Sequence, residues 1–209
     1  EEPWTLLSAG YALYRKGGYG GFLGKGVSGA REIHEAVKDL VGQGADFLKI
    51  INSGIVSLKG EETVSPGGFS DEEWKIIREE AEAHGLKIRC HANSDRAVNQ
   101  ALNFGVSTIE HGFFLSRETL HKMAETGTAW TPTAVALESL KAFGDGEENR
   151  RLERMMDLHL QRVSEAAGLG LKLLVGTDSG SPGIFSGESF FREMELFQKA
   201  GLSLSQILS

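Results

Sequence analysis

Short apolar runs alternate with helical segments along the whole chain, and this alternation limits the possible folds most. The runs occupy residues 4–9, 46–51, 86–91, 106–111, 128–133 and 173–178. Amphipathic helices are predicted over residues 29–43, 70–85, 94–105, 116–127, 147–167 and 188–200. Strands that alternate with helices run parallel, because each helix returns the chain to the same end of the sheet. The sequence therefore predicts an α/β fold with about six strand–helix units.

Four of these runs end in or near a residue that can do chemistry: Lys49, His91, His111 and Asp178. An open, doubly wound sheet collects its site at one switch point, whereas active residues after several different strands are typical of a barrel. We therefore predict a partial TIM (β/α)8 barrel. A complete barrel has eight units and about 250 residues. The 209 residues are expected to be one incomplete barrel domain, 1–209, from the interior of a longer protein.

Each of the four residues also has a structural interpretation that involves no catalysis. A single histidine after a strand is more often a satisfied polar residue than a ligand. Asp178 could cap the turn that follows it. Lys49 lies inside an apolar run, where a charged side chain needs a partner, and an internal ion pair with Glu110 or Asp178 would provide one. Corresponding positions at four strand ends favour a shared metal site instead, since imidazole and carboxylate are zinc ligands.

The motifs around these residues resemble the amidohydrolase superfamily, and within it the imidazolonepropionase-like and Xaa-Pro dipeptidase-like branch. They are a lysine inside a strand at Lys49, His-Ala-Asn at His91, Glu-His-Gly at His111 and Gly-Thr-Asp-Ser at Asp178. The resemblance covers nearly the whole chain. It implies a metal-dependent hydrolase that attacks amide, peptide or cyclic amide C–N bonds with a metal-activated water.

The resemblance also implies a role for each residue. Lys49 would be carbamylated and bridge two divalent metals, Zn²⁺ in the intact enzyme, while His91 and His111 would hold the more exposed ion. Asp178 would bind metal and act as the catalytic proton shuttle. The substrate would be a small amide or dipeptide-like molecule. Its binding residues are not identified, beyond the loops near residues 10–28, 52–69, 134–147 and 179–188.

One family motif is absent: no His-x-His pair occurs anywhere in the sequence. Because that pair binds the more buried metal of the family, the chain alone is expected to have little hydrolase activity. Lys49 is expected to be uncarbamylated or only partly carbamylated, with Asp178 as its first candidate partner. The alternative function is an inactive barrel fragment that binds at most one metal ion or self-associates as a homo-oligomer through its open edges.

Charge and composition exclude other classes of protein. The net charge is −7 with both signs interspersed, so nucleic acid is not an expected partner. No apolar stretch approaches the length of a membrane span. The single cysteine, Cys90, fits a reducing cytoplasmic location and is predicted to face away from the site. The glycine-rich residues 17–26 do not match a phosphate-binding loop, and a nucleotide-binding protein ranks last.

Overall fold

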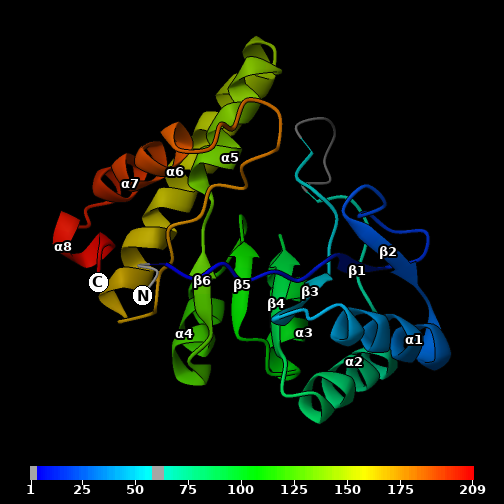
Figure 1. Cartoon of the computed structure of the whole chain (residues 1–209). Helices are drawn as coiled ribbons and strands as arrows, with labels where there is room; N and C mark the ends of the chain where they lie inside the picture. The colour runs from blue at the N-terminus through cyan, green and yellow to red at the C-terminus, as the bar shows by residue number, and fades with distance from the viewer. Residues whose placement is uncertain (1–3, 58–63) are drawn as a thin grey trace.

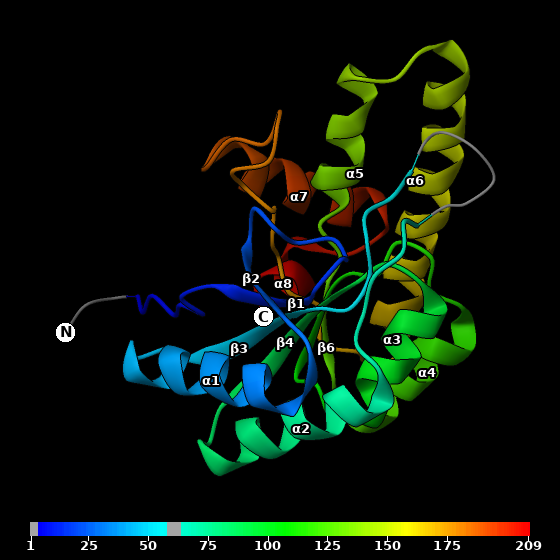
Figure 2. The same cartoon turned by 90° about the vertical axis from the view of Figure 1, so that its right-hand side faces the viewer.

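Six parallel strands form one sheet, with helices covering one of its faces (Figures 1 and 2). The computed structural model describes residues 4–57 and 64–209. The strands are β1 (Ala12–Arg15), β2 (Gly24–Val27), β3 (Phe47–Ile51), β4 (Lys87–Ala92), β5 (Thr108–His111) and β6 (Ala129–Thr131). Their spatial order is β2-β1-β3-β4-β5-β6. From β3 onward, each strand therefore lies beside the next strand in the sequence, as in a β/α barrel.

The longer helices begin and end close to where the sequence predicts. They are α1 (Gly29–Gly42), α2 (Asp71–Ala83), α3 (Asp95–Asn103), α4 (Arg117–Thr126), α6 (Gly146–Gly168) and α7 (Glu188–Lys199). Three short ones follow β6 or end the chain: α5 (Ala134–Ser139), the 3₁₀ helix η1 (Leu140–Ala142) and α8 (Leu204–Ile207). Serine caps start several of them, including a capping box of Ser70 and Glu73 on α2.

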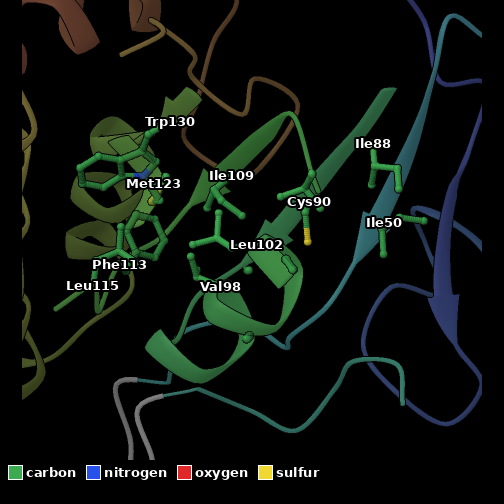
Figure 3. Packing of buried hydrophobic residues seen from close by; sticks show 14 of the residues in the cluster. Ile50, Ile88, Cys90, Val98, Leu102, Ile109, Phe113, Leu115, Met123 and Trp130 are labelled. Carbon is green, nitrogen blue, oxygen red and sulfur yellow. The ribbon is translucent and has the colours of Figure 1, made fainter. Parts of the chain in front are cut away.

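The strand register sorts side chains into rows. The row Leu13, Ile50, Cys90, Ile109 and Trp130 faces the helices, and all five side chains are fully buried. Figure 3 shows Cys90 and Ile109 close to Val98 and Leu102 of α3, inside this core. The opposite face carries a second row, Tyr14, Ile51, His91, Glu110 and Thr131, which we call the inward row. The predicted orientation of Cys90, away from His91, is confirmed.

Two predicted strands are wrong. Residues 4–9 are not a strand, and the rest of the described chain leaves most of their apolar side chains in solvent; Trp4 and Leu6 are 67% and 79% exposed. Residues 173–178 also form no regular strand. This second segment still runs beside β6 for a short stretch: Trp130 N–H donates to Lys172 O at 2.8 Å, and Leu174 N–H donates to Trp130 O at 2.8 Å. The first two strands of the sheet, β1 and β2, lie instead in the region that the sequence predicts as a loop, residues 10–28.

The candidate site at the carboxyl ends of the strands

Two histidine rings meet at the carboxyl ends of β4 and β5. The ring centroids of His91 and His111 are 4.6 Å apart, with the rings nearly perpendicular. Both side chains are buried, at 6% and 8% exposure. The sequence analysis placed both at strand ends, and the parallel sheet brings the two ends to the same edge. These are the predicted site residues that the structure brings into direct contact.

An unusual backbone conformation turns His111 toward His91. In the register of the sheet His111 pairs with Ala92, which belongs to the helix-facing side. His111 has a φ of 73°, in the left-handed region that side chains other than glycine rarely adopt. The Trp130 indole donates to His111 O at 2.9 Å and holds this conformation from the helix side. The left-handed turn therefore brings the imidazole to the inward face.

Each imidazole has one nitrogen engaged by an oxygen of the protein. His91 Nε2 lies 3.1 Å from Gly54 O, and His111 Nδ1 lies 2.7 Å from Thr133 Oγ1. His91 Nε2 also lies 3.3 Å from Asn93 Nδ2, an amide nitrogen that can only donate, whereas the Gly54 carbonyl can only accept. The two contacts therefore favour opposite tautomers of His91. Among the described residues, the second nitrogens, His91 Nδ1 and His111 Nε2, make no hydrogen bond and remain for a ligand. Metal-binding histidines are typically oriented in this way by a hydrogen bond at the second nitrogen.

Both rings are neutral near pH 7. Burial lowers the pKa of His91 to about 4, and burial lowers the pKa of His111 well below its usual value. The positive charge of Lys49 lowers both pKa values further. Only neutral imidazole ligates a metal. The pair is therefore ready to accept a cation without first releasing protons.

Lys49 lies on the same face of the sheet as the histidine pair, farther from the carboxyl ends of the strands. It pairs with Arg89, two residues before His91, and it reaches the same inward face. Burial is the main cause that lowers the pKa of Lys49, and the charges of Glu110 and Asp178 oppose this shift. Among the described residues Lys49 makes no ion pair. The predicted direct ion pair with Glu110 or Asp178 is therefore wrong, although the charges of both carboxylates still influence the amine. The amine stays within range of both histidines, whose pKa values it lowers.

Asp178 reaches the same edge from the irregular segment between α6 and α7, which runs beside β6. Its backbone is also left-handed, with a φ of 60°, and the Ser181 hydroxyl donates to its Oδ2 at 3.0 Å. Solvent reaches Asp178, yet the surrounding protein raises the pKa of its carboxyl. Its charge also raises the pKa of Tyr19, whose ring stacks on His91 at 5.7 Å. Asp178 thus borders the histidine pair without touching it.

The described residues fit part of a metal site and not a complete one. Within residues 4–57 and 64–209, no three His, Cys, Asp or Glu side chains are placed as a metal-binding group. The fit rests on two neutral imidazoles with free nitrogens, and on a carboxylate and an unpaired lysine at the same edge. This donor set is the type that zinc and similar divalent ions take.

The sequence matches a known family over nearly its full length. Residues 9–209 match the Amidohydrolase family. The chain belongs to the amidohydrolase family. The predicted family and the predicted partial barrel are therefore confirmed.

Two curated proteins resemble this amidohydrolase chain. The ochratoxinase of Aspergillus niger is 28% identical over 191 residues, which are 85% of this chain and 39% of that protein. An uncharacterised protein of Mycobacterium tuberculosis is 29% identical over 186 residues, 87% of this chain and 50% of that protein. The chain therefore spans about half the length, or less, of these relatives.

Solved structures give the same result. A Xaa-Pro dipeptidase with bound methionine in the active site matches with a TM-score of 0.70 and 25% identity, over 87% of this chain and 45% of that one. A prolidase complexed with N-methylphosphonate-L-proline matches with a TM-score of 0.73 and 25% identity, over 92% and 53%. The parallel sheet is thus part of an amidohydrolase β/α barrel.

The four predicted substrate loops border two cavities of this amidohydrolase chain. A cavity of ≈ 840 Å³ lies between the loop after β3 and the start of α3, lined in part by Arg15, Ser65 and Arg96. Residues 58–63 of that loop lie outside the described residues. A cavity of ≈ 460 Å³ lies where residues 134–147 and 179–188 meet, next to Phe185 and Arg192. Neither His91 nor His111 lines these two cavities. The region 134–147 contains α5 and η1 rather than an open loop.

Three buried residues that support the amidohydrolase site were not predicted from the sequence. Thr133 contacts His111 directly. Glu193 of α7 accepts hydrogen bonds from Ala134 N–H and Val135 N–H at 2.9 and 2.7 Å. His159 of α6 donates from Nε2 to Pro132 O at 3.0 Å. One signal was available for Glu193: it lies on the apolar stripe of its helix, four residues before Phe197.

Proposed function

We propose that this chain carries part of the active site of a metal-dependent amidohydrolase, which cleaves a C–N bond with a metal-activated water. The observation that supports this most is the His91–His111 pair: two buried, neutral imidazoles in edge contact, each with one nitrogen held and one free. Histidine is only intermediate in its tendency to be buried, so two buried imidazoles in contact at a strand edge favour a functional role. Family membership gives the pair its chemical context.

The proposed substrate class is a small amide or dipeptide-like molecule. Support comes from the similar proteins, which include a Xaa-Pro dipeptidase, a prolidase and an ochratoxinase. The inward face of the sheet offers a lysine amine and a tyrosine ring beside the histidines. These groups suit a compact polar substrate better than a macromolecule.

His91 and His111 would hold the metal, and we propose zinc because neutral imidazole is a favoured zinc ligand. When bound, the ion would polarise the substrate carbonyl and lower the pKa of its bound water. Asp178 would accept a proton at its carboxylate and return it to the leaving nitrogen. Its raised pKa brings the carboxyl closer to the range in which proton transfer in both directions is efficient.

Lys49 would contribute a further ligand after carbamylation, since a lysine carbamate ends in a carboxylate. The lowered pKa of Lys49 favours the neutral amine, which is the form that reacts with carbon dioxide. Without the His-x-His motif we expect partial occupancy at most. Incubation with ¹³C-bicarbonate, followed by carbon NMR, would detect the carbamate. The reducing location suggested by the single cysteine makes the cytoplasm the proposed compartment.

A second candidate function is a non-catalytic barrel fragment that binds one metal ion or self-associates. The observation that favours it is the incomplete ligand set among residues 4–57 and 64–209. This alternative predicts metal binding, or concentration-dependent assembly, without turnover.

Metal content and turnover of the purified chain separate these functions. We would measure zinc affinity by calorimetry and hydrolysis of acyl-proline dipeptides, in the wild type and in His111→Gln. His121→Gln is the matched control, because His121 is an exposed histidine on α4. The proposal expects zinc binding in the wild type and the control, and its loss in His111→Gln. Binding without turnover supports the second candidate. Equal affinity in all three proteins contradicts the proposed site.

A further inference from the structure

The hydroxyl of Thr133 contacts one carbonyl oxygen and one imidazole nitrogen. Together these two contacts determine to which of them the hydroxyl donates its proton. Thr133 Oγ1 is 2.7 Å from His111 Nδ1 and 2.8 Å from Pro132 O. The Pro132 carbonyl has no proton to give, so the hydroxyl must donate to it. The hydroxyl oxygen is then an acceptor toward His111, and Nδ1 must carry the imidazole proton. Only one arrangement of protons satisfies both contacts.

We propose that Thr133 is a positioning residue that locks His111 in the Nδ1–H tautomer and points its unprotonated Nε2 into the site. In free histidine the Nε2–H tautomer predominates, so this lock reverses the intrinsic preference. The use of Nε2 as a metal ligand rests on the proposed function. The tautomer itself does not, because it follows from the hydrogen bonds of the protein alone.

The surroundings of Thr133 hold it rigidly in a conformation that threonine does not favour. Its φ is 48°, in the left-handed region, which is unusual for a β-branched residue. Only 3% of the residue is exposed. On the C-terminal side, Glu193 binds the N–H groups of Ala134 and Val135. On the N-terminal side, His159 donates to Pro132 O, the same carbonyl that accepts the Thr133 hydroxyl.

These contacts explain why the hydroxyl cannot turn away. Pro132 O has two lone pairs, and His159 and Thr133 use one each. Both groups come from elements fixed by burial, α6 and the start of α5. A strained residue persists only when its environment determines it from several sides. The strain at Thr133 therefore serves to hold one oxygen against one imidazole nitrogen.

The test is the tautomer of His111 in the metal-free protein, measured from the ¹⁵N chemical shifts of the imidazole nitrogens near pH 7. His111→Gln assigns the resonances, because they disappear from its spectrum. Thr133→Val removes the hydroxyl and keeps the shape, and Thr133→Ser keeps the hydroxyl. Thr131→Val is the matched control, since Thr131 is a buried threonine on β6 whose methyl group packs against Gly176.

The proposal expects the Nδ1–H tautomer in the wild type, in Thr133→Ser and in Thr131→Val, and a shift toward Nε2–H in Thr133→Val. Zinc affinity should fall about tenfold to a hundredfold in Thr133→Val, the usual effect of removing an outer hydrogen bond to a ligand. Thr133→Ser should restore it. An Nε2–H tautomer in the wild type, or an unchanged tautomer in Thr133→Val, overturns the positioning role. The predicted tautomer pattern in a wild type that binds no metal supports the lock and contradicts the proposed function instead.

Discussion

His111, Thr133 and Asp178 share a property at the scale of single residues: each has a left-handed backbone. No other non-glycine residue in the described part of the chain does. All three lie at or just after the carboxyl end of a strand or of the segment beside β6. Left-handed conformations of such residues cost roughly 1–3 kcal/mol and concentrate at functional sites. The strain in this chain is therefore gathered at one edge of the sheet.

Gly112 lies next to His111 at the carboxyl edge of the sheet, which we call the rim. A substitution at Gly112 would show how closely the rim is packed around His111. It has a φ of 60°, and a Cβ placed on it would lie 2.9 Å from the Trp130 indole nitrogen that holds His111 O. Gly112→Ala should lower the free energy of unfolding by about 2–3 kcal/mol, from backbone strain and the displaced indole together. Gly127→Ala is the control: its φ is 69° but no atom lies within 4 Å of the added methyl group. Equal losses in urea denaturation would mean that contact with Trp130 contributes nothing.

Lys49 should affect function and stability in opposite directions. The lysine is partly buried on the inward face without an ion pair among the described residues, so its charge is poorly compensated. Lys49→Met should leave the free energy of unfolding unchanged or raise it by about 1 kcal/mol, while zinc affinity or turnover falls. Lys87→Met, an exposed lysine at the start of β4, should change neither. A loss of stability greater than 1 kcal/mol in Lys49→Met would show that the amine has a partner.

Sequence reasoning found the residues of the site that carry chemistry and missed those that hold them. His91 and His111 stand out because the carboxyl ends of the strands in a β/α barrel are where such folds place their catalytic residues. Thr133 and His159 give no such signal, because their roles depend on contacts between segments far apart in the sequence. The turn of His111 toward the inward face was equally hidden, since simple alternation would place its side chain among the helices.

At the scale of elements, α5 depends on a neighbouring helix for its first turn. Helix starts leave backbone N–H groups unpaired, and Glu193 of α7 accepts from two of them. Burial raises the pKa of Glu193 to about 7, although the two N–H donors oppose the shift. The contact joins α7 to the segment that carries Thr133. Packing between the two helices and the geometry of the rim are therefore linked.

Glu193→Ala should destabilise the chain and disturb the rim together. Two buried N–H groups would lose their acceptor, at about 1–3 kcal/mol each, and urea denaturation would measure the loss. The His111 tautomer should become mixed as Thr133 loosens. Glu195→Ala removes an exposed carboxylate of the same helix that pairs with Arg192, and it should cost less than about 1 kcal/mol. Similar losses in both variants would contradict the structural role of Glu193.

The helices were more predictable than the strands. Periodic apolar positions and serine caps define helix ends locally, as on α2 and α4. β2 was missed because two of its four residues are glycine and only Val27 is apolar, and a glycine-rich segment usually indicates a loop. Its glycines are needed for close approach: a Cβ on Gly24 would collide with the Ala12 backbone. Residues 4–9 have the composition of a strand, but an apolar run forms one only where a neighbour pairs with it.

At the scale of the whole molecule, several buried histidines set how stability depends on pH. Burial lowers the pKa of His91 and of His159 to about 4, and that of His111 also falls. In the unfolded chain each returns to about 6.5. Between pH 6.5 and 4 the unfolded state therefore binds more protons than the folded state, so stability falls as the pH falls. Glu193 acts in the opposite sense, because its pKa is raised in the folded state. Its contribution to the free energy of unfolding is therefore lost as the pH rises from about 4.5 to 7.

The metal-free chain should thus lose stability on acidification from pH 7 to pH 5. A fully buried histidine with such a shift contributes about 3 kcal/mol across its window, and Glu193 offsets part of the total. Urea midpoints at pH 7, 6 and 5 would measure the slope. His159→Asn should reduce it, while His121→Asn, at an exposed position, should not. A midpoint that does not change between pH 7 and pH 5 would contradict the lowered pKa values.

The overall architecture was predictable because it follows from alternation alone: parallel strands, helices between them and a shared carboxyl edge. The order of the sheet from β3 to β6 follows the sequence, as barrel topology requires. Whether a strand pairs with its neighbour depends on the backbone of both, which composition does not encode. In residues 4–57 and 64–209, every helix is too short or too polar to cross a bilayer.

Chemical labelling of the Cys90 thiol would report how often the folded protein opens. The thiol is fully buried beneath α3, and burial raises its pKa to about 12, so alkylating reagents cannot reach a reactive thiolate in the folded state. Labelling can then proceed only when α3 lifts from the sheet or the whole chain unfolds. The labelling rate would measure that opening under native conditions. A cysteine introduced on the surface could meanwhile carry a probe with the natural thiol left in place.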